Sequence, residues 1–199
     1  LYRNSLKMLL ALDTTDGICN VGISSGNAIL GFSQVSIYRG TSEIIFPQIE
    51  KTLTQAHIDL HELSGFVVCT GPGNYTSLRI AISAVRGMAL ACGKPSVGIN
   101  LFELLAPEKR PALAIVKGPV GKVYVQELSL ETFPKRPLLT YVEKVKKRQD
   151  LKDFTISGHK AEEIAQAVGG NHLALTNKKK KKNLIELGLS RIKEDKKRP

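Results

Sequence analysis

The sequence predicts an α/β fold of two lobes, of which the second is reduced. Three strands joined by tight turns are expected first, over Met8–Leu12, Ile18–Ser24 and Ala28–Ser36. A helix, a strand, a second helix and another strand are expected next, at about Thr41–Ala56, Phe66–Thr70, Thr76–Cys92 and Ser96–Ile99. This is the element order of a ribonuclease-H-like lobe, and the actin-like, heat-shock-ATPase-like (ASKHA) fold pairs two such lobes.

The residue types of the first lobe explain these boundaries. The turns at Asp13–Gly17 and Ser25–Asn27 are rich in turn-forming residues. Thr41 or Ser42 is expected to cap the first helix, and Pro47 is expected to kink it. The apolar face of that helix recurs at helical spacing, at Ile45, Ile49, Leu53 and Ala56.

The second lobe is predicted from a weaker pattern. A short helix, a join and a hairpin-like pair of strands are expected at Leu101–Leu105, Ala106–Pro111, Ala112–Val116 and Lys122–Leu128. A basic helix, a strand and two more helices are expected at Tyr141–Arg148, Phe154–Ser157, Lys160–Val168 and Leu184–Ile192. We therefore expect a leader at residues 1–7 before a natural start at Met8, then a lobe at 8–106, a smaller lobe at 107–175 and a basic tail at 176–199.

Charge is distributed unevenly along the chain. Residues 1–107 hold seven basic and seven acidic side chains, whereas residues 108–199 hold 22 basic and 11 acidic ones, which accounts for the net charge of +11. The run Lys178–Lys182 would attract polyanions such as tRNA, because their counterions are released on binding. The alternative is a solvated, flexible tail, which the absence of aromatic neighbours favours.

The composition argues against several classes of protein and site. The longest apolar runs are too short to span a bilayer, and no secretory signal is visible. Cys19, Cys69 and Cys92 have no C-x-x-C spacing, which favours free thiols in a reducing cytoplasm. His57 and His61 form H-x-x-x-H without the glutamate of a zinc protease, so we interpret this spacing as coincidence. No metal or cofactor is expected.

One aspartate offers the strongest hint of catalysis. Asp13-Thr14-Thr15 lies in the turn where actin-like ATPases keep an aspartate and hydroxyls near phosphate and magnesium, although such residues are also common in ordinary turns. The corresponding hairpin of the second lobe, Ile115–Tyr124, has no carboxylate. Without a second acid, magnesium and an attacking water are hard to hold. We therefore expect no catalytic residue.

The most specific segment is a glycine-rich corner at Gly71-Pro72-Gly73-Asn74-Tyr75. A buried strand enters this corner and a helix begins directly after it. Gly71 and Gly73 permit backbone conformations that other residues avoid, and the helix start could hold an anion. A purely structural corner is the simpler interpretation, and the spaced Gly-Lys-Ser/Thr of a Walker A loop is missing.

The helix after this corner is apolar on two sides. Leu78, Ala81, Ile82, Val85 and Ala89 form one face, and Ile80, Ala84, Gly87 and Ala91 form a second face of mostly small residues. A surface helix usually has a single apolar stripe, so the second face needs a cover. That cover is either the other helix of the lobe or a partner, and both could contribute to a four-helix bundle.

Three segments, in order and spacing, resemble the TsaB (YeaZ) family: Met8–Thr15, Thr41–Pro47 and Gly71–Ile80. Gly121–Tyr124 is similar to a second-lobe strand of that family, and the match covers about residues 8–130. The resemblance implies a two-lobed paralogue of TsaD, the subunit that transfers the threonylcarbamoyl group to adenosine 37 of tRNA. It also implies that the chain carries no chemistry of its own.

The resemblance further implies partners. TsaB relatives bind TsaD through the first two helices of each protein, and TsaE, an ATPase, joins the pair. We therefore expect an interface at Ile45, Ile49, Arg79, Ile80, Ser83, Ala84, Arg86 and Gly87, beside a motif turn that includes Asp13, Gly71, Gly73 and Tyr75. A homodimer could use the same face, and any contact with tRNA would be indirect. An actin-fold ATPase or kinase using Asp13, or a basic RNA-binding module, remains the alternative.

Overall fold

The computed structural model describes residues 8–106, 108, 111–128, 136–175 and 177–195. The chain divides into two compact units, one comprising residues up to Asn100 and from Lys181 onward, the other residues Leu101–Lys180. The boundary lies six residues before the expected end of the first lobe. The last segment also belongs to the first unit instead of forming a separate tail.

The first unit contains a five-stranded sheet with helices on both faces. Its elements are β1 (Met8–Asp13), β2 (Ile18–Ser25), β3 (Ala28–Ser36), α1 (Thr41–Ala56), the 3-10 helix η1 (Leu60–Glu62), β4 (Gly65–Cys69), α2 (Tyr75–Cys92), β5 (Ser96–Ile99) and most of α6 (Asn177–Asp195). The strand order is β3-β2-β1-β4-β5, with β1 to β3 antiparallel and β1, β4 and β5 parallel. The predicted ribonuclease-H-like order is confirmed.

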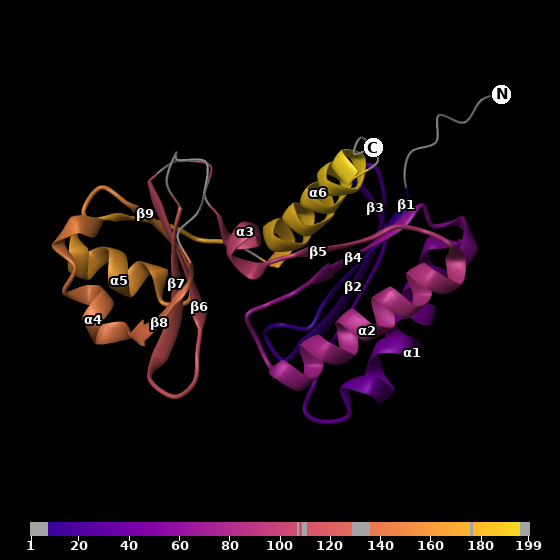
Figure 1. Cartoon of the computed structure of the whole chain (residues 1–199), viewed down its shortest axis with the longest axis horizontal. Coiled ribbons are helices and arrows are strands. Elements are labelled where there is room, and N and C mark those ends of the chain that lie inside the picture. The colour runs from indigo at the N-terminus through magenta and orange to yellow at the C-terminus, as the bar shows by residue number, and fades with distance from the viewer. Residues whose placement is uncertain (1–7, 107, 109–110, 129–135, 176, 196–199) are drawn as a thin grey trace. The chain divides into compact units, whose positions relative to one another are not determined.

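Alternate residues of the central strands point to opposite faces of this sheet. Leu10 and Phe66 are completely buried in the core cluster under α1 and α2. On the other face, Val67 lies against Gly188 of α6, and Gly65 lies against Ile192. Figure 1 shows the same arrangement, with α1 and α2 below the sheet and α6 above it.

Helix α1 begins differently from the prediction. Gly40 precedes it in a left-handed conformation, with φ of 67°, and neither Thr41 nor Ser42 caps it through a side chain. The Thr41 hydroxyl instead lies 2.9 Å from the Ser77 hydroxyl, which joins the first turns of α1 and α2. Pro47 lies inside the helix, which continues past it to Ala56.

Helix α6 occupies residues 177–195 of the segment expected as a basic tail at residues 176–199. It begins at Asn177, and the predicted weak helix at residues 184–192 is its packed part. Its apolar stripe is buried, at Leu184, Ile185, Leu189 and Ile192. The Arg191 guanidinium donates a hydrogen bond of 3.0 Å to the Gly98 carbonyl at β5. The lysine run is therefore the start of a docked helix.

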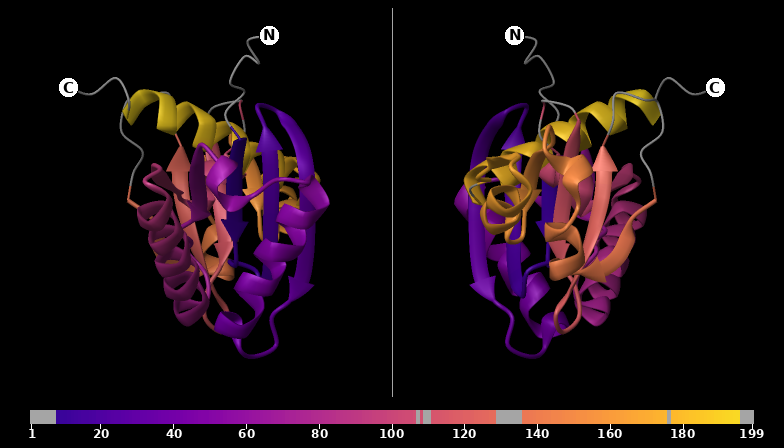
Figure 2. Two further views of the ribbon diagram at one scale, coloured as in Figure 1. Left: turned by 90° about the vertical axis from the view of Figure 1, so that its right-hand side faces the viewer. Right: turned by 90° about the vertical axis from the view of Figure 1, so that its left-hand side faces the viewer.

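The second unit is a smaller five-stranded sheet in the order β10-β9-β6-β7-β8. Its elements are α3 (Leu101–Leu105), β6 (Ala112–Lys117), β7 (Lys122–Leu128), β8 (Leu138–Tyr141), α4 (Val142–Lys146), the 3-10 helix η2 (Gln149–Leu151), β9 (Thr155–Gly158), α5 (Ala161–Val168) and β10 (Asn171–Leu173). The predicted hairpin is confirmed, since Val116 pairs with Tyr124 in antiparallel register. The right-hand view of Figure 2 shows α4 and α5 in front of this sheet.

Two parts of this unit differ from the prediction. The basic helix expected at Tyr141–Arg148 is only five residues long, and β8 precedes it. The short strand β10 follows Gly170, where no element was expected. Within the part of the chain that the structure describes, no helix is both long and apolar enough to cross a membrane.

Candidate partner-binding surface

The turn that begins at Asp13 is held by hydrogen bonds between its own residues. The backbone amide of Thr15 donates to Asp13 Oδ1 at 3.0 Å, and the Thr15 hydroxyl donates to the same oxygen at 2.7 Å. Asp13 is 6% exposed, so these hydrogen bonds satisfy a buried carboxylate oxygen. This geometry gives Asp13 a structural role at the end of β1.

The glycine corner packs directly against that turn. A Cβ added at Gly73 would lie 2.9 Å from the Thr15 carbonyl oxygen, and one at Gly71 would lie 2.6 Å from Leu78 Cδ1. Gly71 also has φ of 90°, which L side chains rarely adopt. Both glycines are therefore required by close packing. The Asn74 side chain then accepts a 3.0 Å hydrogen bond from the Ser77 amide and so caps α2.

The outer surface of α1 and α2 holds most of the predicted interface, but not all of it. Ile45, Ile49 and Ala84 lie in the core of the first unit, at 0%, 3% and 9% exposure. Side chains so deeply covered by their own unit leave little surface for a partner, and their assignment to the interface stays a prediction. They repeat at helical spacing because they face the sheet.

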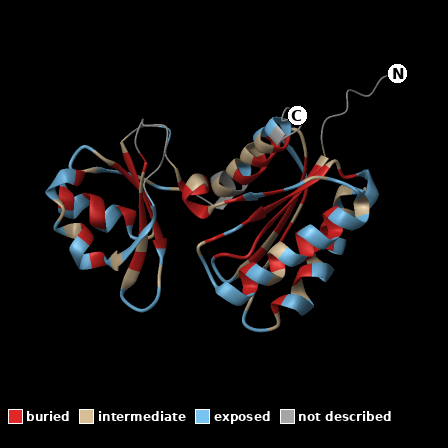
Figure 3. Cartoon of the chain, in the orientation of Figure 1, coloured by how far each residue is buried: buried red, intermediate tan, exposed pale blue. Residues whose placement is uncertain are grey.

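The remaining predicted residues lie on the outer side of α2. Arg79, Ser83, Arg86 and Gly87 are exposed, and Ile80 is half-buried. A Cβ added at Gly87 would meet no described atom within 4 Å. Figure 3 shows the division along both helices, with buried residues toward the sheet and exposed residues away from it. Residues 76–92 are thus not fully covered by the described part of the chain.

Three large side chains on this surface were not predicted as contacts. Phe46 on α1 is 49% exposed, and Tyr75 and Leu90 on α2 are 65% and 85% exposed. The Arg79 guanidinium lies 4.0 Å from the centroid of the Tyr75 ring, a cation–π contact. The sequence could have identified two of them, because Phe46 and Leu90 are apolar residues on the otherwise polar sides of amphipathic helices. We call the set Phe46, Tyr75, Arg79, Gly87 and Leu90 the α1–α2 patch.

The other candidate sites give no comparable arrangement. Helix α1 ends at Ala56, with His57 in a left-handed conformation and His61 in the separate η1 helix, so the two histidines do not share a helical face. Among the described residues, no group of three or more His, Cys, Asp or Glu side chains could hold a metal ion. Burial, and then the charge of Asp13, raise the pKa of the Cys19 thiol to about 11.

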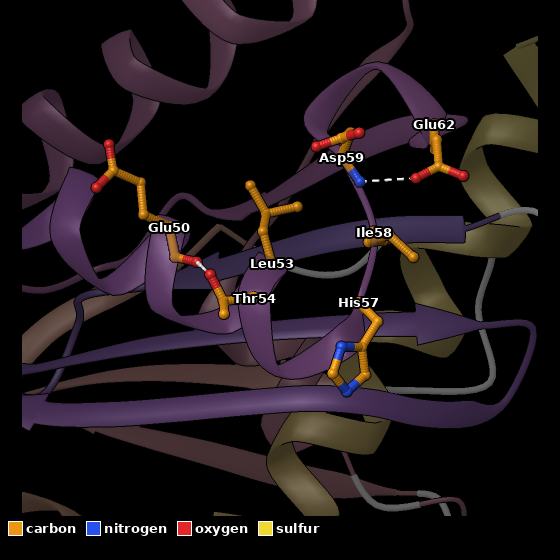
Figure 4. Close-up of a pocket in the computed structure, with 7 residues that line it drawn as sticks. All are labelled: Glu50, Leu53, Thr54, His57, Ile58, Asp59 and Glu62. Atoms are coloured by element: carbon orange, nitrogen blue, oxygen red, sulfur yellow. Dashed lines mark hydrogen bonds between the residues drawn. The ribbon is translucent and has the colours of Figure 1, made fainter.

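A pocket of about 430 Å³ lies at the carboxyl end of α1. Figure 4 shows its lining residues, Glu50, Leu53, Thr54, His57, Ile58, Asp59 and Glu62. Two of its polar groups serve the local backbone: the Thr54 hydroxyl donates to the Glu50 carbonyl, and Glu62 accepts from the Asp59 amide at 2.7 Å. The polar groups of this pocket therefore stabilise the end of α1 and the turn that follows it.

Comparisons with known proteins agree with this fold. The family described as TsaD, tRNA N6-adenosine threonylcarbamoyltransferase, matches residues 35–194. A tRNA threonylcarbamoyladenosine biosynthesis protein TsaB from Buchnera aphidicola is 30% identical over 59% of this chain and 58% of its own length. The Escherichia coli protein of the same name is 26% identical over 60% and 54%. The matched region thus spans little more than half of these two relatives.

Solved structures show the same fold over nearly the whole chain. YeaZ from Pseudomonas aeruginosa superposes with a TM-score of 0.70 at 21% identity, covering 95% of this chain and 94% of that one. An activator of 2-hydroxyisocaproyl-CoA dehydratase from Clostridium difficile has a TM-score of 0.58 at 11% identity, covering 96% and 97%. The chain belongs to the family described as TsaD, tRNA N6-adenosine threonylcarbamoyltransferase, and it is similar in sequence to proteins named TsaB and in fold to YeaZ.

Proposed function

We propose that the chain is a non-catalytic subunit that binds a TsaD-type transferase and supports formation of N6-threonylcarbamoyladenosine at position 37 of tRNA. Similarity to proteins named TsaB is the first support, because two such relatives are named for the biosynthesis of this nucleoside. The subunit would work in the cytoplasm as a heterodimer, with a TsaE-type ATPase as a third component.

The observation that carries the proposal is the α1–α2 patch. Large apolar and aromatic side chains exposed on two helices that pack together, with an arginine beside one of them, are typical of the residues that dominate binding energy at interfaces. Gly87 leaves open space at the surface of α2, which would allow a partner helix to approach closely. The interface would therefore consist of this patch with Ile80, Ser83 and Arg86 around it.

The stacked pair in this patch would favour tight binding. Arg79 already lies over the Tyr75 ring, so less side-chain freedom would be lost when a partner covers both. Arginine and tyrosine are also among the residues most enriched at interface hot spots. Removing either side chain should weaken the complex more than removing the exposed Ser83.

Two features support the absence of catalysis. The β6–β7 hairpin corresponds in element order to the second phosphate turn of an actin-like ATPase, and its segment Lys117–Lys122 contains no acid. Holding magnesium and orienting a water would need carboxylates on both sides of a nucleotide. Asp13, the acid at the end of β1, accepts two hydrogen bonds from Thr15.

Gly87→Leu tests the proposal. Because no described atom lies within 4 Å of an added Cβ, the variant should fold, and loss of a glycine from a helix interior should not lower its stability. The leucine should nevertheless block a close helix approach and abolish co-purification with the cognate TsaD-type protein. Gln55→Leu adds the same side chain on the exposed surface of α1 outside the patch and should leave the complex intact. A full yield of complex with Gly87→Leu would refute the interface.

A further inference from the structure

Strand β8 lies at one edge of the second sheet, whose order is β10-β9-β6-β7-β8. It pairs in antiparallel register with β7, from Leu138 opposite Val125 to Tyr141 opposite Lys122. No strand that the structure describes lies along its other side. Pro137, which has no backbone N–H, directly precedes β8, and α4 begins directly after it, so the free edge is four residues long. An edge of this kind presents backbone N–H and C=O groups to a further strand.

The side chains of β8 are mostly apolar and exposed. Leu138, Leu139 and Tyr141 are 60%, 41% and 49% exposed, so three of the four residues leave large apolar surface in water. Successive residues of a strand project to opposite faces, so Leu138 lies on one face of the sheet and the other two lie on the opposite face. Edge strands usually carry charged side chains that prevent pairing with other chains, and β8 has none. The strand is therefore suited to pairing with a strand of another protein.

The unpaired charges next to this edge are positive. Lys122 Nζ lies 5.1 Å from the centroid of the Tyr141 ring, and the exposed Arg136 lies two residues before β8. Neither Lys122 nor Arg136 forms an ion pair with any described residue. Glu143, the acid nearest to β8 along the chain, is already paired with Lys146 at 3.0 Å. A segment that pairs with β8 would therefore gain affinity from carboxylates of its own.

These features distinguish between three kinds of occupant. A second copy of the chain would bring the same lysine and arginine side chains against one another, and like charges that face each other across a pair of strands are unfavourable. RNA would match the charges, but single-stranded RNA is bound mainly by stacked rings, and β8 offers one ring beside two leucines. An extended acidic peptide matches the free backbone edge, the apolar side chains and the charges together.

We infer that the free edge of β8 binds an extended segment of a partner protein by strand addition, and that this segment carries both acidic and apolar side chains. Backbone hydrogen bonds would supply affinity, while contacts with the exposed apolar side chains and with Lys122 and Arg136 would select the segment. The site lies in the second unit and shares no residue with the α1–α2 patch. The inference therefore does not depend on the proposed function.

The probe is a fluorescently labelled peptide of four Val-Glu repeats, and its affinity for the full chain is measured by fluorescence anisotropy. The same peptide with lysine in place of glutamate tests the charge. A version with all backbone amides N-methylated tests strand addition, because it keeps the side chains and loses the backbone donors. We expect the Val-Glu peptide to bind, and both altered peptides to bind about tenfold or more weakly.

Two variants test the position of the site. Leu138→Glu removes an exposed apolar contact and Arg136→Glu reverses a charge, and each should weaken binding of the Val-Glu peptide about fivefold or more. Ile29→Glu is the control for the first, because Ile29 is a 44% exposed residue of β3, an edge strand of the first sheet. Lys152→Glu is the control for the second, since it reverses an exposed charge outside β8. Both controls should change the affinity less than about twofold.

Several results would overturn the inference. They are the absence of binding of the Val-Glu peptide to the parent, equal binding of either altered peptide, and unchanged binding by the two variants. Arg136 lies outside the strand, so Arg136→Glu remains decisive if Leu138→Glu alters the circular dichroism.

Two other results would assign the edge to a different occupant. An oligouridine that binds more tightly than the peptide, and is released by Arg136→Glu, would assign it to RNA. A parental dimer in sedimentation that Leu138→Glu converts to monomer would assign it to a second copy. Both variants keep the α1–α2 patch and should still co-purify with the TsaD-type partner, so this inference and the proposed function fail separately.

Discussion

Replacing Gly188 with alanine tests whether α6 docks on the first sheet as the structure shows. In a solvent-exposed helix this change would stabilise the protein, because alanine has a higher helix propensity than glycine by about 1 kcal/mol. Gly188, however, faces Val67 of β4, and an added Cβ would lie 2.9 Å from Val67 Cγ1 and closer still to Cγ2. Contacts under 3.0 Å require the sheet or the helix to move.

The two effects have opposite signs, and the packing term should be the larger one. Inserting a methyl group into a close-packed interior costs about 1–3 kcal/mol. After subtracting the gain in helix propensity, we expect Gly188→Ala to lower the free energy of unfolding by up to about 2 kcal/mol. Gly87→Ala is the matched control, since the same change in open space should raise that free energy by about 0.5–1 kcal/mol.

Urea unfolding followed by circular dichroism measures both variants against the parent. We expect the midpoint to fall for Gly188→Ala and to rise for Gly87→Ala. Equal stabilisation by both substitutions would show that position 188 is open to solvent in solution. Docking of α6 on β4 would then be wrong.

Three further substitutions and measurements follow from the contacts. Asp13→Ala should lower the free energy of unfolding by about 1–3 kcal/mol, because the buried amide and hydroxyl of Thr15 lose their acceptor. ATP turnover that is present in the parent and lost in this variant would contradict a structural role for Asp13. Hydrogen bonds, chiefly from Lys146, lower the pKa of Glu163 from its ordinary 4.5. Their contribution to the free energy of unfolding is therefore present above pH 4.5 and is lost as the pH falls through the lowered pKa. Glu163→Gln should therefore destabilise the chain at neutral pH and converge with the parent in acid, and a pH-independent difference would refute this. Cys19, whose pKa is about 11, should resist a thiol reagent at about pH 8 until urea unfolds the chain, whereas labelling in the native state would contradict its burial.

The sequence predicted the first unit well because its elements are short and strongly patterned. The fully apolar run at Phe66–Cys69 and the adjacent glycine corner could hardly be anything other than a buried strand and a tight turn, and the structure has both. The start of α1 was wrong for a physical reason. Gly40 supplies the left-handed residue that begins the helix, while the Thr41 hydroxyl is used in a contact with Ser77, 36 residues further along the chain.

The interface prediction could not distinguish buried from exposed positions, because burial cannot be read from spacing. Ile45 and Ile49 repeat as a helix face should, but the spacing does not say whether that face meets the chain's own sheet or a partner. Phe46 and Leu90 were missed because single apolar residues on polar faces are common and carry little weight alone. The packing of helix α6 was not predicted, because its many lysines make its apolar stripe hard to recognise in the sequence. The structure shows that this stripe is buried.

The most direct measurement for the central claim is amide hydrogen exchange of the full chain, alone and with its cognate TsaD-type protein. We expect added protection in peptides from α1 and α2, over residues 41–56 and 75–92, and little change in the second unit. Protection confined to the second unit, or no protection in α2 at saturating partner, would contradict the assignment of the α1–α2 patch as the binding surface.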